Sequence, residues 1–74
     1  MKNYFKNEKG VYCLDDETQE YSSISISAES CVFGKGSNPI GYENMMKLVT
    51  VSFQEGTEEE YLQKKEEALS RLSL

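Results

Sequence analysis

The chain has 74 residues and a mass of 8.4 kDa, and it is 38% hydrophobic and 28% charged. Folding a chain of this size hides only about 60% of its extended surface, which excludes several domains and a large enclosed active site. Acidic residues outnumber basic residues by 13 to 8, and the resulting net charge of −5 disfavours direct binding to nucleic acid or to an anionic membrane. We therefore expect a single domain over residues 1–74.

The N-terminal segment and the cysteine content bear on location and chemistry. Residues 1–7 hold two lysines but no apolar stretch of the signal-peptide type, and no apolar run approaches the roughly 20 residues that span a bilayer. We therefore expect a cytoplasmic protein with no membrane partner, in which Cys13 and Cys31 are free thiols. Because the chain has no histidine, the commonest general base and a usual zinc ligand are missing. The prediction is no enzyme activity, no metal and no cofactor.

Two short aromatic segments open the chain. Residues 3–6 and 11–14 are rich in aromatic and β-branched types, and the polar stretch 7–10 between them ends in Gly10. This pattern predicts a β-hairpin with a four-residue loop. Residues 15–20 are polar and acidic, and are expected to form an exposed connection.

The middle of the chain holds the clearest alternation. Ile24 and Ile26 alternate with serines within residues 21–27, which predicts a strand with one apolar face. Residues 30–33 either continue that strand past a bend or pair back as a separate short strand. Residues 34–41 contain three glycines and the single proline of the chain, so we expect a loop there.

Residues 46–53 carry the strongest strand pattern. Val49, Val51 and Phe53 share one face of the predicted strand, and the residues between them share the other. Gln54, Glu55 and Gly56 end the run.

A helix is predicted over residues 58–72. Thr57 and Glu60 have the spacing of a capping box, and the glutamates of the first turn suit the positive end of the helix dipole. The apolar stripe is narrow, so the helix must pack on the sheet. Strands followed by a helix indicate an α+β fold, in which a small antiparallel sheet of four or five strands, β-rich over 1–53, carries one C-terminal helix over 57–73 on one face.

The acidic connection is the first candidate site. Its four acids lack the spacing of a calcium loop, so we interpret them as a solvated turn or as a docking patch for a basic protein surface. These residues are Asp15, Asp16, Glu17 and Glu20. Residues 34–37 lack the full phosphate-loop spacing and predict a turn.

Two further features are candidates for protein binding. Helix-start chemistry accounts for Glu58 and Glu59, although both also add to the surface acidity. Five tyrosines and three phenylalanines exceed what so thin a core can hold, so some are expected to be surface anchors. Tyr42 is the predicted exposed anchor, and a half-buried ring that closes the sheet edge is the alternative.

Two segments together resemble small bacteriophage and prophage proteins, including tail-fibre assembly proteins. Tyr4 to Glu17 has an aromatic and lysine-containing hairpin, a short aromatic strand and an acidic turn. Val49 to Glu60 resembles the strand of these proteins and the Thr-Glu-Glu-Glu helix start after it. The Pro-rich segment that often follows in that family is absent, and residues 22–44 have no counterpart. The resemblance implies a phage-type accessory protein that binds protein, and it transfers no catalytic residue.

These observations favour a non-enzymatic protein-binding module of phage or mobile-element type. It would dock to a protein partner with a basic surface, as an assembly factor or as an inhibitor of a host protein in the host cytoplasm. One alternative is that the acids imitate a phosphate array and block a host nucleic-acid-binding defence protein. The others are a homo-oligomeric structural subunit and a small-molecule binder that uses the 34–41 loop.

Overall fold

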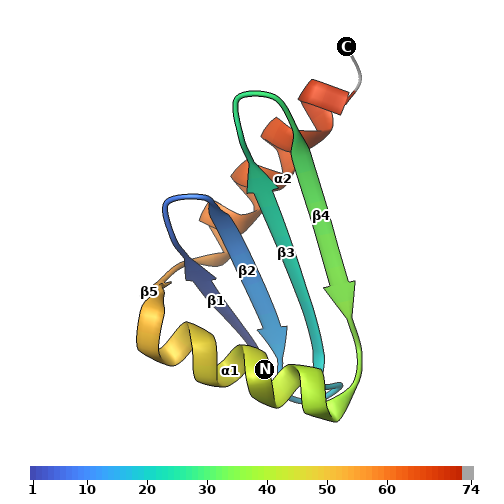
Figure 1. Ribbon diagram of the computed structural model, residues 1–74, viewed down its shortest axis with the longest axis vertical. Coiled ribbons are helices and arrows are strands. Elements are labelled where there is room, and N and C mark those ends of the chain that lie inside the picture. Colours follow the sequence, from blue (N-terminus) through green and yellow to red (C-terminus); the bar gives the residue numbers. More distant parts are fainter. Residues whose placement is uncertain (73–74) are drawn as a thin grey trace.

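A five-stranded antiparallel sheet runs through the protein, and a helix lies on each of its faces (Figure 1). The computed structural model describes residues 1–72. The elements in chain order are β1 (Lys2–Lys6), β2 (Gly10–Asp15), β3 (Glu20–Ile26), β4 (Cys31–Gly36), α1 (Pro39–Ser52), β5 (Gln54–Glu55) and α2 (Glu58–Leu72). The α+β class, the antiparallel sheet and the C-terminal helix are confirmed. The predicted helix end at residue 73 falls outside the described residues.

The sheet has the order β4-β3-β2-β1-β5. The predicted hairpin of β1 and β2 is confirmed, and β4 pairs back on β3, which is the second of the two alternatives for residues 30–33. The Ser27 N–H donates to the Ser30 carbonyl at 2.8 Å and closes the β3–β4 turn. Each of the strands β1 to β4 pairs with the strand next to it in sequence, so residues 1–36 form a meander. Its assembly needs only pairing between neighbouring segments of the chain.

Helix α2 covers one face of the sheet. Side chains alternate between the two faces of a strand, and this alternation sends Val11 of β2 and Ile24 of β3 toward α2. Ala68 of α2 packs against both, and all three side chains are buried. The small Ala68 lets the helix approach the sheet closely, with Tyr61 beside it.

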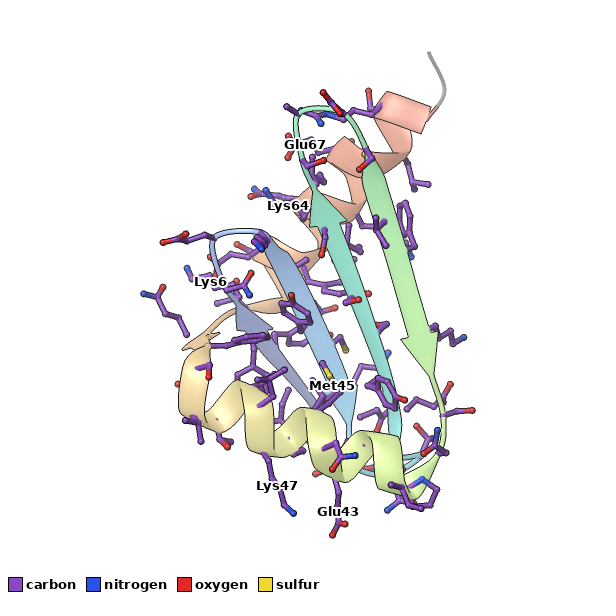
Figure 2. All side chains as sticks on the ribbon, viewed as in Figure 1. Lys6, Glu43, Met45, Lys47, Lys64 and Glu67 are labelled. Atoms are coloured by element: carbon purple, nitrogen blue, oxygen red, sulfur yellow. The ribbon has the colours of Figure 1, made fainter. Side chains whose placement is uncertain are left out.

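Helix α1 covers the opposite face. Leu14 from the sheet and Val49 from the helix are completely buried on this side. The rings of Tyr12 and Phe53 meet with centroids 4.6 Å apart, and Figure 2 shows Met45 pointing from α1 toward the sheet. The protein therefore has two thin cores, one on each side of a single sheet.

The strand predicted at 46–53 is wrong, and so is the expectation of a single helix. Residues 39–52 are helical, and the predicted loop 34–41 is divided between the end of β4 and the start of α1. The β-branched run misled the prediction because the packing of a helical stripe outweighs intrinsic strand preference. That stripe recurs at helical spacing and consists of Tyr42, Met45, Met46, Val49 and Phe53.

The start of α1 has a clear physical cause. Asn38 has an extended backbone, and its side chain accepts a hydrogen bond from the Gly41 N–H at 2.6 Å, which makes it the N-cap. Pro39 follows in the first turn, where its missing N–H costs nothing. A residue before proline is disfavoured in helical conformation, so Asn38 marks the boundary of α1.

Tyr21 joins β3, β4 and α1. Its half-buried ring lies over Gly36 at the end of β4 and reaches Gly41 in the first turn of α1. A Cβ atom at either glycine would overlap the ring. Both positions are therefore glycine because the tyrosine occupies the space that a side chain would need.

Replacing Gly36 with alanine should destabilise the protein by about 1–3 kcal/mol, because the new methyl group overlaps the Tyr21 ring. Chemical denaturation followed by circular dichroism measures the loss. Gly56→Ala is the matched control, since its Cβ would lie 3.4 Å from its nearest neighbour, an ordinary contact, and should cost below about 0.5 kcal/mol. Equal losses in the two variants would contradict this account of Tyr21.

Helix α2 is attached to the sheet by polar contacts as well as by its core. The capping box is confirmed: the Glu60 N–H donates to Thr57 Oγ1 at 3.2 Å, and the Thr57 N–H donates to Glu60 Oε1 at 3.0 Å. Within residues 1–72, no ion pair joins Glu60 to Lys64 or Glu67 to Arg71, although both have the i,i+4 spacing of helical pairs. Instead Glu60 binds Lys6 of β1, and Arg71 donates to the Ser27 carbonyl at 2.6 Å. These long-range contacts replace contacts within the helix.

The pair of Lys6 and Glu60 should make stability depend on pH. The hydrogen bond from Lys6 lowers the pKa of Glu60 below its ordinary value of 4.5. A lowered folded-state pKa contributes stability above the unfolded-state pKa, and this contribution disappears as the pH falls through the folded-state value.

We therefore expect Lys6→Gln to lower the free energy of unfolding at neutral pH and to flatten its decline toward about pH 3. Urea denaturation at a series of pH values measures this decline. Lys64→Gln is the control, because Lys64 is as exposed as Lys6 but its pair with Glu67 is a longer contact, 3.6 Å, within one helix. A Lys6→Gln profile parallel to that of the native protein would refute the role of the pair.

Candidate functional site

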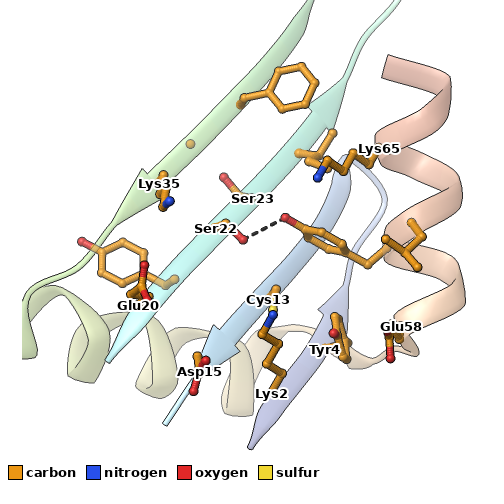
Figure 3. A pocket seen from close by; sticks show the side chains of 16 residues that line it. Lys2, Tyr4, Cys13, Asp15, Glu20, Ser22, Ser23, Lys35, Glu58 and Lys65 are labelled. Atoms are coloured by element: carbon orange, nitrogen blue, oxygen red, sulfur yellow. Dashed lines mark hydrogen bonds between the residues drawn. The ribbon is translucent and has the colours of Figure 1, made fainter. Parts of the chain in front are cut away.

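A groove lies on the α2 side of the sheet, where the helix leaves the surface uncovered (Figure 3). Its volume is about 530 Å³. Strands β1 to β4 form the floor and the first two turns of α2 form one wall. Charged, aromatic and apolar side chains line it, among them Lys2, Tyr4, Cys13, Asp15, Glu20, Ser22, Phe33, Lys35, Glu58, Tyr61, Leu62 and Lys65.

Charges of both signs surround this groove. Three lysines and three acids line it: Lys2, Lys35, Lys65, Asp15, Glu20 and Glu58. Among residues 1–72, none of the three lysines lies within 4 Å of a carboxylate. Asp15 Oδ1 accepts from the Glu17 N–H at 3.0 Å and lies 3.9 Å from the Met1 amino group. The groove therefore presents unsatisfied charges that a bound segment of opposite charge could pair with.

Tyrosine rings and a hydroxyl pair form the centre of the groove. The hydroxyls of Ser22 and Tyr61 lie 2.8 Å apart, and the Tyr61 ring lies 5.7 Å from that of Tyr4. Burial raises the pKa of the Tyr4 hydroxyl and that of the Cys13 thiol. Because the thiolate is the nucleophilic form, a raised pKa keeps Cys13 weakly reactive at neutral pH. These groups suit binding through hydrogen bonds and aromatic surface.

The side of the groove away from α2 is the open edge of the sheet. Strand β4 is the last strand in the sheet order, and Figure 1 shows no element beyond it. The Ser27–Ser30 pair is hydrogen-bonded, and bonded and non-bonded pairs alternate along an antiparallel ladder. Cys31, Phe33 and Lys35 belong to non-bonded pairs with β3. Their backbone N–H and C=O groups therefore point toward the open edge.

Apolar side chains accompany this edge. Phe33 is 44% exposed and Val32 is 58% exposed. Across the groove, Leu62 and Leu69 of α2 are each about half exposed, and their seven-residue spacing puts them on one side of the helix. Phe33 and Leu62 both line the groove, so its edge strand and its helical wall each present an apolar contact.

The acids predicted as a docking patch divide between the groove and the turn next to it. Asp15 and Glu20 line the groove, whereas Asp16 and Glu17 lie beyond it in the exposed β2–β3 turn. The Met1 amino group donates to Asp16 Oδ1 at 2.5 Å and lies 3.2 Å from Glu17 Oε1.

The other predicted residues divide in the same way. Glu58 lines the groove, and the exposed Glu59 follows it in the first turn of α2 without lining the groove. Tyr42, expected to be exposed, is half-buried in α1, and burial raises the pKa of its hydroxyl. This matches the alternative of a half-buried ring. Protein binding by these residues stays a prediction.

Sequence reasoning missed Phe33, Lys35, Leu62 and Lys65 as parts of one surface. Local pattern identifies a strand at 30–33 and a helix at 58–72, but it does not say that this strand lies at the sheet edge. The one available sequence signal is the adjacent pair Val32 and Phe33, which is apolar on both faces of a short strand. A strand buried on one side only would alternate.

Within residues 1–72, no cluster of three or more acidic or cysteine side chains could hold a metal ion. Neither helix in this part of the chain is long and apolar enough to cross a membrane. Comparison with known proteins finds no family model, curated protein or solved structure that matches the chain.

Replacing Tyr61 with phenylalanine should lower the free energy of unfolding by about 1 kcal/mol, because the Ser22 hydroxyl loses its partner in a half-buried position. The double variant Tyr61→Phe with Ser22→Ala should cost less than the sum of the single variants, since both remove the same bond. Denaturation of the four proteins measures this coupling. Strict additivity would show that the hydroxyl pair contributes nothing.

Proposed function

We propose that the protein is a non-enzymatic protein-binding module that adds an extended segment of a partner to β4. The observation that carries the proposal is the open six-residue edge strand with its outward-facing backbone groups and exposed Val32 and Phe33. Such an edge is a ready template for pairing with another chain. Peptide recognition by strand addition takes its affinity from main-chain hydrogen bonds and its specificity from alternate side-chain pockets.

The groove supplies those pockets. Side chains of an added strand that point toward α2 would lie beside Phe33 and Lys35, and would face Leu62 and Lys65 of the wall. An apolar residue suits the contact with Phe33 and Leu62. An acidic residue two positions along the added strand from that apolar residue points to the same face. It suits Lys35 and Lys65, because pairs of opposite charge between strands are favourable. The best partner segment thus alternates, with one apolar and one acidic residue on its inner face.

The groove also holds acids. Asp15, Glu20 and Glu58 line it among the lysines, and Lys2 lies opposite Asp15 in the β1–β2 register, so a basic residue of the segment, or a basic surface next to it, would find carboxylates to pair with. This supports the expectation of a partner with a basic surface.

The cellular role that we propose is that of a phage-type accessory protein, either an assembly factor or an inhibitor of a host protein. Its support is the resemblance of residues 4–17, and of the helix start at residues 57–60, to tail-fibre assembly proteins. The strand part of that resemblance, from Val49 on, does not count, because residues 39–52 are helical. Imitation of a phosphate array is less well supported, because Lys2, Lys35 and Lys65 lie among the acids of the groove. A uniform negative field would need those positions to be neutral or acidic.

Selection of a random peptide library on the immobilised protein tests strand addition. We expect enrichment of extended segments with alternating apolar and acidic residues. Phe33→Ala should weaken a selected peptide by about fivefold through loss of the ring, and Phe33→Pro should weaken it by about a further tenfold, because proline also removes an outward N–H donor. Isothermal titration measures both affinities.

Two controls keep the test decisive. Val51→Glu changes an exposed residue of α1 and should leave peptide affinity unchanged. Lys35→Pro removes a second outward N–H and replaces Phe33→Pro if circular dichroism shows that the latter is unfolded. Equal affinities of the Phe33→Ala and Phe33→Pro variants would exclude strand addition. Peptide binding that survives Phe33→Ala, Phe33→Pro and Lys35→Pro would place the binding site elsewhere.

A further inference from the structure

Helix α1 exposes large apolar side chains on its outer side, in addition to the apolar side chains that pack on the sheet. Ile40 is 75% exposed, Val51 is 85% exposed and Leu48 is 47% exposed. A helix that packs on one face of a sheet ordinarily carries charged and polar residues on its other side. Three large apolar side chains on this short helix indicate a second surface that another protein covers.

The outer residues form one stripe. An α-helix turns by about 100° per residue, so residues 40, 44, 47 and 51 lie within about 60° of one another. Their order along the helix is Ile40, Asn44, Lys47 and Val51, and Glu43 lies beside Lys47 at the margin. Figure 2 shows Glu43 and Lys47 both pointing away from the sheet.

This stripe is symmetric about its own midpoint. Ile40 and Val51 lie at its ends, at equal distances along the helix from the point between Met45 and Met46. The polar residues Asn44 and Lys47 lie between them, also at equal distances from that point. A two-fold axis at that point would run two copies of α1 antiparallel, with each position opposite its mirror position. An isologous interface requires such self-complementarity.

We propose that α1 is a homodimer interface, in which the outer stripe packs antiparallel against the same stripe of a second copy. Ile40 then contacts Val51 of the second copy, and the contact occurs twice. Glu43 lies within one turn of Lys47 of the second copy, on the same flank of the pair of helices, and this contact also occurs twice. Leu48 covers the other flank.

The charges favour this occupant over a different protein. In the described part of the chain neither Glu43 nor Lys47 has an opposite charge within 4 Å. The antiparallel arrangement pairs each with its opposite and leaves no charge of the stripe unmatched. These local attractions act against the repulsion between two chains of net charge −5, and salt screens that repulsion.

This interface does not depend on the proposed peptide groove. The groove lies on the α2 face of the sheet and α1 lies on the opposite face, so a dimer through α1 leaves both β4 edges open. A dimer would present two such edges, and binding to a partner with two segments would be strengthened by the linkage.

Sedimentation velocity of the full chain from about 10 µM to about 1 mM tests the dimer. The native protein should change from monomer to dimer with concentration. Val51→Glu should raise the dissociation constant by about tenfold or more, because it places two charges in the apolar ends of the interface. Phe33→Lys, on the β4 edge, should leave the constant unchanged.

A charge exchange provides the sharper test. Glu43→Lys and Lys47→Glu should each weaken the dimer by about fivefold, because each creates two like-charge contacts across the axis. The double variant with both changes restores opposite charges and should return to within about twofold of the native constant. Glu43 and Lys47 also lie at i and i+4 on one helix, so the stability of each variant is measured by chemical denaturation, and only a change in the dissociation constant larger than the change in stability supports the contact across the axis.

Several results would overturn the proposal. A monomer at all concentrations excludes the dimer. A dimer that Phe33→Lys abolishes and Val51→Glu leaves intact forms through β4 instead. A double variant no stronger than the single variants excludes the antiparallel arrangement. A monomer, or a failed charge exchange, leaves the β4 edge open, so neither bears on peptide binding there. A dimer through β4 would compete with the peptide for that edge, and the library selection tests peptide binding separately.

Discussion

The constraint on which the structure depends is that one sheet of short strands must bury both of its faces with only two helices. Alternation along the strands sends Val11 and Ile24 to α2 and Leu14 to α1. Helices of 14 and 15 residues are too short to cover a face completely. The groove, the β4 edge and the outer side of α1 are what remains uncovered, so the candidate interfaces follow from the way in which the core is built.

Polar contacts determine where α2 lies and therefore where the groove opens. Glu60 binds Lys6, Arg71 reaches the β3–β4 turn, and Tyr61 meets Ser22. These contacts attach the helix along its length to three different parts of the sheet. The lysines and acids of the groove take no part in them, so attaching the helix leaves the groove charges available.

Helix α1 shows how a tertiary contact overrides local preference. Its β-branched residues favour a strand, yet Tyr42, Met45 and Val49 recur at the spacing that one helical face needs. Thr50 satisfies its hydroxyl by donating to the Met46 carbonyl at 2.7 Å, as Thr and Ser in helices often do. The same residues therefore serve a helix once a sheet is present to bury its inner side.

The sequence by itself determined the first hairpin, the exposed acidic turn and the capped C-terminal helix, because pairing between neighbours and capping act over a few residues. It left two alternatives for residues 30–33, and it predicted a loop at 34–41, where α1 begins. It also directed attention to acids of which the fold places only Asp15, Glu20 and Glu58 in the groove. Only the tertiary structure decided which strand is the edge, how Phe33 and Leu62 come to share a groove, and which side of α1 faces water. These depend on sheet order and helix placement, which arise from contacts between residues far apart in the chain.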